Sequence, residues 1–258
     1  MQQLLKYFKS RKRAQTFLLR YSRRKFSKKG FHRFRVEVKR LNALLQVLYW
    51  GDPTFDPKYA SKPIRKLFKK AGPIRERQLE KDLLIEHNLL DQVPKLKAQL
   101  DKEIQKKRKE FFKSRNLSRT KKIKKRFKQI KKLIKNQKNF DFTLFIEDLW
   151  EEIMQMIALG IDSENAHLLR KKLKTYLYSL EILGKGNFPI HYPKIEELSS
   201  LLGEWHDRDV FLIRVEKENL TAQIVPEELG VFNDFVEKIR QESRELFQSI
   251  QTQLAQIK

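Results

Sequence analysis

The chain has 258 residues, of which 57 are Lys or Arg and 32 are Asp or Glu, so its formal net charge is +25 at pH 7. It contains no cysteine, which excludes disulfides, thiolate zinc sites, iron–sulfur clusters and cysteine nucleophiles. No apolar run approaches the ~20 residues that a membrane-spanning helix needs, and the first residues lack the apolar stretch of a signal peptide. We therefore expect a soluble cytoplasmic protein without membrane insertion.

Apolar residues recur at intervals of three and four along nearly the whole chain, and Leu, Lys, Glu and Gln are frequent, which favours helices. Gly and Pro are too few for a sandwich of many short strands joined by tight turns. The expected fold class is therefore all-α. The predicted helices are 3–27, 31–50, 62–71, 74–90, 94–114, 118–137, 141–158, 163–184, 193–203, 206–219 and 226–256.

Glycine and proline set most of the predicted helix boundaries. The Gly-Asp-Pro cluster at 51–53 ends the second helix, and Gly184 with the residues after it ends the helix that begins near 163. Pro63, Pro193 and Pro226 fit first-turn positions, because the missing N–H of proline has no intrahelical partner there.

The positive charge is concentrated in two segments. Residues 1–40 carry a net charge of +14 and residues 102–138 carry +16, whereas residues 139–258 are mildly acidic at −8. Concentrated charge of one sign in a folded chain indicates a polyanionic partner such as nucleic acid, an anionic membrane surface or another phosphate polymer. The alternative is a surface whose charge serves only solubility.

The helix predicted near 118–137 has a narrow apolar stripe of Ile123, Phe127, Ile130 and Ile134, and its other faces are almost entirely Lys and Arg. A helix that lies on a membrane surface has this pattern. A bundle helix with a basic solvent face has it too, and we favour the bundle helix.

An internal repeat relates the two halves of the chain. Residues 32–41 align with 167–176, with His, Arg and Lys at matching positions, and residues 71–78 align with 202–209. Two matching segments in the same order and at nearly the same spacing indicate a duplicated unit whose halves meet near residue 139.

Each repeated helix has an apolar face and an opposite basic face when it is projected at 100° per residue. The basic faces carry His32, Arg35 and Lys39 in the first copy and His167, Arg170 and Lys174 in the second. Arg binds phosphate oxygens through two parallel hydrogen bonds, and Lys and His add charge and donors, so these faces fit a phosphate-binding wall. The alternative is that both are ordinary charged helix faces.

These motifs resemble a known family. The pattern HRFRVEVKRL at 32–41 resembles the first signature of CHAD domains, the conserved-histidine α-helical domains, and HLLRKKLKTYLYSLEIL at 167–183 resembles the second. GPIRERQ at 72–78 and LGEWHDRDV at 202–210 resemble further segments of that family, and the resemblance extends over essentially the whole chain. Glu76 and Gln78 stand where the first copy of the family usually has a pair of Asp residues.

The resemblance implies a single domain over 1–258, made of two four-helix bundles at about 1–138 and 139–258. They would be related by pseudo-two-fold symmetry, with a basic central groove. It also implies non-catalytic binding of inorganic polyphosphate, a location in the cytoplasm or at polyphosphate granules, and a stand-alone CHAD protein without a fused triphosphate-tunnel module. The expected polyphosphate-binding residues are His32, Arg35, Lys39, Arg40, Arg75, His167, Arg170, Lys171, Lys174 and Arg208.

Other residues and functions fit less well. Asp207 and Asp209 suit structural roles that orient groove Arg and His, and His87, His191 and His206 are expected at the surface or in loops. We expect no catalytic residues, no metal site and no cofactor, since no Gly-rich phosphate loop or nucleophilic triad is present. The alternatives to polyphosphate are other polyanions, chiefly non-specific nucleic-acid binding, and an enzyme that acts on phosphate chains.

Overall fold

The computed structural model describes residues 2–22, 26–136, 141–184 and 189–257, and within these ranges it has helices and no strand. This confirms the all-α prediction. The helices are α1 (Gln2–Arg20), α2 (Lys28–Gly51), α3 (Pro57–Glu86), α4 (Pro94–Ser114), α5 (Leu117–Asn136), α6 (Thr143–Ala158), α7 (Ser163–Leu183), α8 (Tyr192–Lys217), the short 3-10 helix η2 (Leu220–Gln223) and α9 (Pro226–Ala255).

Several predicted boundaries are confirmed. Pro193 and Pro226 lie in the first turns of α8 and α9. Gly184 follows α7 with φ of +89°, a left-handed conformation that favours glycine. The first helix ends at Arg20 rather than at residue 27, and residues 23–25 lie outside the described ranges, as does the predicted midpoint at 139.

Three predicted breaks are wrong. The breaks expected before Pro63 and around Gly72 both fall inside the single helix α3, and the break expected near Gly203 falls inside α8. An internal proline removes one backbone hydrogen bond and crowds the preceding turn. The apolar face of α3, which includes the buried Ile64 and Ile74, packs against neighbouring helices and offsets that local cost.

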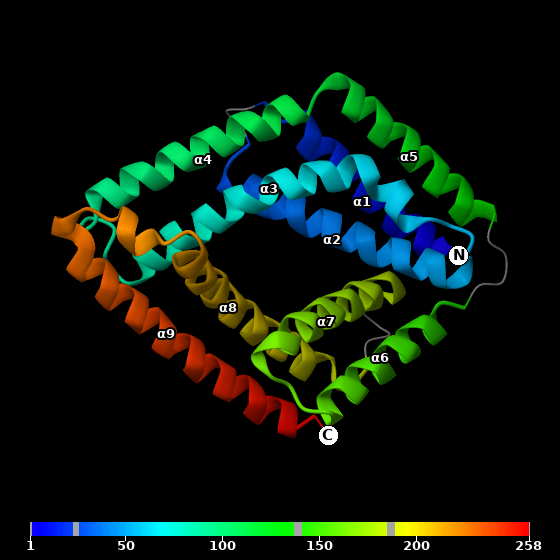
Figure 1. The fold of residues 1–258 in the computed structure, drawn as a ribbon. Coiled ribbons are helices and arrows are strands. Elements are labelled where there is room, and N and C mark those ends of the chain that lie inside the picture. Colours follow the sequence, from blue (N-terminus) through cyan, green and yellow to red (C-terminus); the bar gives the residue numbers. More distant parts are fainter. Residues whose placement is uncertain (1, 23–25, 137–140, 185–188, 258) are drawn as a thin grey trace.

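The arrangement places α2 and α3 opposite α7 and α8. In Figure 1, α4, α5, α6 and α9 form the outer rim of the molecule, and α2, α3, α7 and α8 lie inside it. Helix α2 packs against α1, α3 and α7, and α8 packs against α3, α7 and α9. The two halves of the chain therefore meet through their repeated helices.

Two buried hydrophobic clusters hold the helices together. The larger cluster joins α1, α2 and α5 to α6, α7 and the ends of α3, α8 and α9, with Leu41 and Leu173 among its buried residues. The smaller one joins the far ends of α3 and α8 to the beginnings of α4 and α9, with Leu84 and Phe235 inside it. Both clusters contain residues from each half of the chain, and the grouping into two four-helix bundles stays a prediction.

None of the described helices has an apolar stretch long enough to cross a bilayer. Helix α5 buries Ile123, Phe127, Ile130 and Ile134. These residues pack in the larger cluster, and α5 contacts α1 and α3. The structure thus confirms that this helix belongs to the bundle.

The repeat is visible in matched ion pairs. Arg77 on α3 pairs with Glu103 on α4 and with Glu218 at the end of α8. Arg208, which aligns with Arg77 in the repeat, pairs with Glu242 on α9 and with Glu86 at the end of α3. Each arginine therefore joins a neighbouring helix of its own half to the other half.

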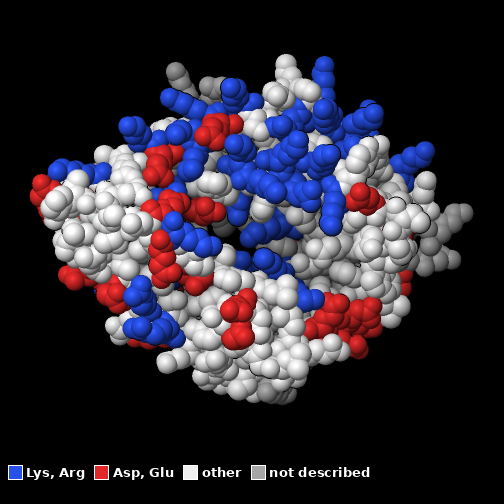
Figure 2. All heavy atoms as spheres, in the orientation of Figure 1, with Lys and Arg blue, Asp and Glu red and all other residues white. Residues whose placement is uncertain are grey.

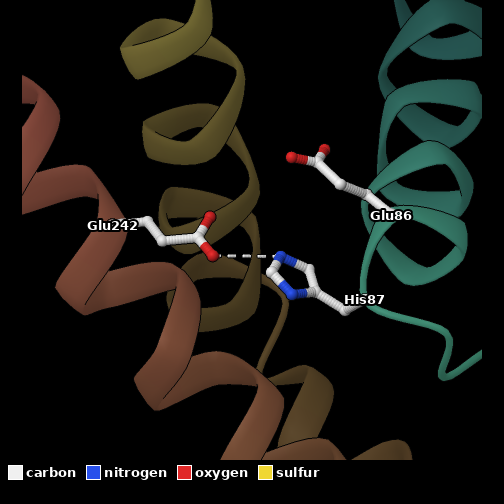
Figure 3. Close-up of side chains that lie close together, drawn as sticks. All are labelled: Glu86, His87 and Glu242. Carbon is white, nitrogen blue, oxygen red and sulfur yellow. Dashed lines mark ion pairs between the residues drawn. The ribbon is translucent and has the colours of Figure 1, made fainter.

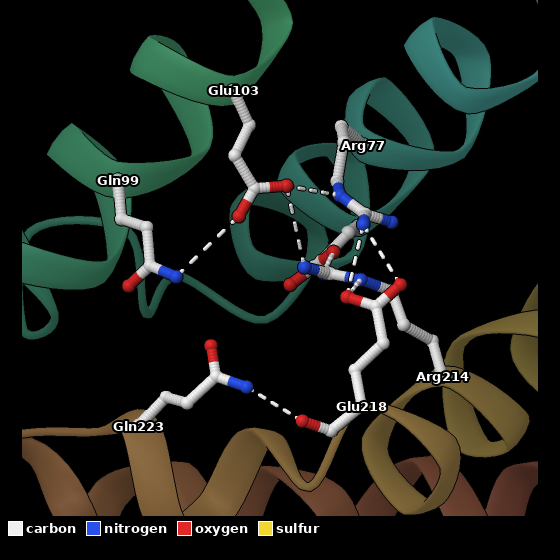
Figure 4. A network of polar contacts seen from close by, with 7 residues as sticks. Arg77, Gln99, Glu103, Arg214, Glu218 and Gln223 are labelled. Atoms are coloured by element: carbon white, nitrogen blue, oxygen red, sulfur yellow. Dashed lines mark hydrogen bonds and ion pairs between the residues drawn. The ribbon is translucent and has the colours of Figure 1, made fainter.

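Arg77 belongs to a larger polar network near the smaller cluster (Figure 4). Arg214 on α8 pairs with Glu80 and Glu103 and lies 3.0 Å from a carboxylate oxygen of Glu218. The side chains of Arg214 and Glu80 are 9% and 3% exposed. A buried pair of this kind is costly to break, because the remaining charge has no water around it.

We predict that Arg214→Met lowers the free energy of unfolding by about 3–5 kcal/mol, since Glu80 would keep its burial and lose its bonded partner. The measurement is urea unfolding of the purified variant. Arg240 on α9 is the control, because its pairs with Glu216 and Glu237 are exposed, and Arg240→Met should cost at most about 1 kcal/mol. Equal losses in the two variants would contradict the assignment.

Burial raises the pKa of Glu80 from 4.5 to about 7, although Arg214 and Arg77 lower it. The folded state therefore binds more protons than the unfolded state between these values, and the contribution of Glu80 to stability is lost as pH rises from about 4.5 to 7. We predict that Glu80→Gln removes this pH dependence. The measurement is the urea midpoint of the wild-type protein and of Glu80→Gln across this pH range. Parallel curves for the two proteins would refute the prediction.

Candidate functional site

A cavity of about 150 Å³ lies where α2, α3, α7 and α8 meet, and we call it the groove. Figure 2 shows the hollow at the centre of this face, with Lys and Arg side chains around it. The groove is lined by His32, Arg35, Val36, Lys39, Gly72, Arg75, Glu76, Leu79, Arg170, His206, Asp207 and Val210. Five of the predicted site residues therefore share one wall, and they come from three helices of both halves.

Arg35 is fixed against α3. Its guanidinium lies 4.4 Å from the ring centroid of Phe68, and Nη1 donates a hydrogen bond to the Phe68 carbonyl at 3.4 Å. Gly72 makes this position possible, since a Cβ there would lie 3.2 Å from Nη1. Burial lowers the pKa of Arg35, and nearby Arg75 and Arg170 add to the effect while Glu76 opposes it.

Lys39 is the most strongly perturbed cation of the groove. Burial, and after it the positive charges of Arg170, Arg35 and Lys174, lower its pKa from 10.5 to about 8, although Asp207 raises it. Burial also lowers the pKa of Arg170 and of Lys174. A bound anion would relieve both the repulsion that acts on Lys39 and the lost hydration of these cations.

One carboxylate from α8 lies among these cations. Burial raises the pKa of Asp207, whereas Arg170, Arg75 and Lys39 lower it. Among the charges near Arg170, that of Asp207 raises the pKa of Arg170 the most. Asp207 therefore offsets part of the positive charge around Arg170.

The histidines of the second copy form a chain at the groove. His167 Nε2 lies 2.9 Å from a carboxylate oxygen of Asp209, and its Nδ1 lies 3.0 Å from Nδ1 of His206. Burial and then the charge of Arg170 lower the pKa of His206 to about 3. His206 is thus neutral at physiological pH, while His167 is held by a carboxylate.

The expectation that His206 lies at the surface or in a loop is wrong, because His206 lies in α8 and lines the groove. The signal was present in the repeat, in which His206 aligns with Arg75, another groove residue. His87 lies in the turn that follows α3, as expected, although its side chain is only 8% exposed and packs near Phe235 of α9. His191 stacks on Trp150, and its Nε2 is hydrogen-bonded to the hydroxyl of Tyr176 at 2.8 Å.

Two of the predicted phosphate contacts are engaged elsewhere. Arg40 is bonded to Glu181 on α7 and to Glu37 on α2, and Arg208 is bonded to Glu242 and Glu86. Neither lines the groove. We assign both to ion pairs between helices, since each guanidinium is already neutralised by two carboxylates.

The remaining predicted residues lie near the groove but not in its wall. His167 contacts His206, and the charge of Lys174 acts on Lys39. Lys171 is exposed and lines a different cavity, beside Trp50 and Thr175.

The Glu86, His87 and Glu242 side chains lie together between α3 and α9 (Figure 3) and offer three ligand atoms within 4.8 Å of one another. Arg208 donates to both carboxylates, at 2.9 and 2.7 Å. The guanidinium supplies the positive charge that a metal ion would bring, so we assign this cluster to holding α3, α8 and α9 together.

Fold and groove together define an all-helical protein in which helices from the first and second halves of the chain meet at a cluster of cations. The family model for the CHAD domain matches residues 13–216, and the chain belongs to this family. The crystal structure of the CHAD domain from the plant Ricinus communis has the same fold, with a TM-score of 0.70 and 17% sequence identity, over 98% of this chain and 88% of that one. Among proteins with curated descriptions, none matches this sequence.

Gly72 and Gly203 give a matched pair of substitutions. Both lie in helix interiors, where Ala is favoured over Gly by about 1 kcal/mol. A Cβ at Gly203 would lie 4.0 Å from Arg170, an ordinary contact, whereas a Cβ at Gly72 would crowd Arg35. We predict that both Ala variants keep or raise the melting temperature, and that only Gly72→Ala weakens binding of inorganic polyphosphate.

Thermal unfolding and a binding titration on both variants test this prediction. If Gly203→Ala weakened binding as much as Gly72→Ala, the position of the Arg35 guanidinium would not be the cause.

Proposed function

We propose that the protein binds inorganic polyphosphate in the groove between α2, α3, α7 and α8, without catalysis. The observation that carries the proposal is the convergence of Arg35, Lys39, Arg75 and Arg170 on one cavity, from three helices of both halves. The sequence resemblance to CHAD domains implies the same ligand.

Charge balance in the groove supports an anionic ligand. The cations Arg35, Lys39, Arg75 and Arg170 face two carboxylates in the groove, Glu76 and Asp207. Arg75 also pairs with Asp82 at 3.5 Å, and Lys174 adds to the positive field. Burial, and after it the neighbouring positive charges, lower the pKa of Lys39. Phosphates of a linear chain carry a charge on each unit and accept the hydrogen bonds that buried Arg and Lys donate.

The narrow shape of the site favours a chain of small phosphates over nucleic acid. Duplex DNA is read by elements that enter a groove ~12 Å wide, and single strands are bound by stacking of bases on exposed aromatic rings. No Phe, Tyr or Trp is among the residues that line the groove. Of the two histidines in the groove wall, His206 is half-buried and packs edge-on against His167, and His32 is exposed.

Non-catalytic binding is part of the proposal. The groove offers donors and positive charge, and its carboxylate Asp207 is held among three cations. Incubation of polyphosphate with the protein and a divalent metal, followed by measurement of chain length, tests it. Shortening or extension of the chain that Lys39→Ala abolishes would overturn the non-catalytic assignment.

We predict that Arg35→Ala/Lys39→Ala and Arg170→Ala/Lys174→Ala each weaken polyphosphate binding about 10²-fold, because each removes two charge-assisted hydrogen bonds. The measurement is a titration of labelled polyphosphate at moderate salt, with duplex DNA and single-stranded RNA as competitors. Polyphosphate should displace both nucleic acids at equal phosphate concentration.

The charge-matched control is Lys238→Ala/Arg244→Ala, which removes two exposed cations from α9. It should change the affinity less than about threefold, since surface charges far from a site are screened by salt. If the control weakened binding as much as the groove variants, net charge rather than the groove would account for binding. Wild-type affinity should fall steeply with salt, as expected for phosphate contacts.

A further inference from the structure

A second basic cavity lies outside the groove, between α3, α4 and α5. It has a volume of about 420 Å³ and is lined by Lys66, Lys69, Lys70, Pro73, Lys107, Glu110, Ser114 and Arg119. Five of these eight residues are cations and one is a carboxylate, a greater excess of positive charge than the groove has. No part of this cavity coincides with the residues that line the groove.

The positive charge of this cavity is only partly balanced. Lys70 pairs with Glu110 at 3.0 Å, and this contact lowers the pKa of Glu110. Arg119 donates to the carbonyl and the hydroxyl of Ser114, which orients the guanidinium at the cavity edge. Lys66 and Lys69 are exposed and form no ion pair with any residue that the structure describes.

Helix α3 connects the two cavities. Gly72 lines the groove, and the next residue, Pro73, lines the second cavity. Lys69 of the second cavity and Glu76 of the groove lie on one stripe of α3, seven residues apart, which is about 10 Å at 1.5 Å per residue. Figure 2 shows Lys and Arg gathered above the central hollow, over the region where Figure 1 draws α3.

We propose that the cavity between α3, α4 and α5 is a second phosphate-binding site, and that a long polyphosphate chain occupies it together with the groove. This inference rests on the proposed function. A short chain fills one site only, whereas a chain that spans both gains the second contact at a high effective concentration. The protein therefore prefers long chains to short ones.

Lys66→Ala/Lys69→Ala tests the proposal, with tripolyphosphate and long-chain polyphosphate as the probes. Both side chains are exposed, so the variant should keep its helices, and circular dichroism checks this. We expect the affinity for long-chain polyphosphate to fall at least about tenfold, with a shallower salt dependence by about one to two counterions. The affinity for tripolyphosphate, bound in the groove, should change less than about twofold, as in Lys238→Ala/Arg244→Ala.

Two results would overturn the second site while leaving the proposed function in place. One is long-chain affinity no weaker than in the Lys238→Ala/Arg244→Ala control. The other is an equal loss for tripolyphosphate and long chains, which would place Lys66 and Lys69 in the same site as Arg35. If Arg35→Ala/Lys39→Ala leaves tripolyphosphate binding unchanged, the proposed function itself fails.

Discussion

The crowding of like charges at the meeting of α2, α3, α7 and α8 is the constraint on which the rest of the structure depends. Burial lowers the pKa of Arg35, Lys39 and Arg170, and the charge of Arg170 lowers the pKa of Arg35 and Lys39 further. Such a cluster costs folding free energy. The hydrophobic clusters that join both halves hold these side chains in place.

Two kinds of arginine lie where helices of the two halves meet. Arg77, Arg208 and Arg214 each contact two or more carboxylates, and they join helices across the two halves. Arg35 lies instead beside Gly72, and Arg170 lies beside Gly203. Glu76 is the carboxylate that raises the pKa of Arg35 the most, and Asp207 has this role for Arg170. The first class stabilises the framework, and the second leaves donors directed at the groove for a ligand.

The sequence predicted the helices and much of the groove. The period of apolar residues identified the helices, and the repeat placed His32, Arg35, Lys39, Arg170 and their partners on matching faces. Local rules failed in α3 and α8, where tertiary packing overrides the breaking tendency of proline and glycine.

Helix faces alone could not separate ligand contacts from structural ion pairs. Arg40 and Arg208 stand in the repeated motifs, but their partners Glu181, Glu242 and Glu86 come from helices far away in the sequence. The role of His206 depends on the packing of α8 against α7, which no local pattern encodes. The second cavity arises from three helices, each of which is merely basic when taken alone.

The pKa of Lys39 tests the central claim most directly. Nuclear magnetic resonance of labelled lysine side chains, with and without tripolyphosphate, would follow its titration, and Lys39→Arg identifies the signal. The account predicts a value near 8 without ligand and an increase of at least about one unit when phosphate is bound, because a bound anion favours the charged amine. An ordinary lysine value without ligand, or no change on addition of tripolyphosphate, would contradict it.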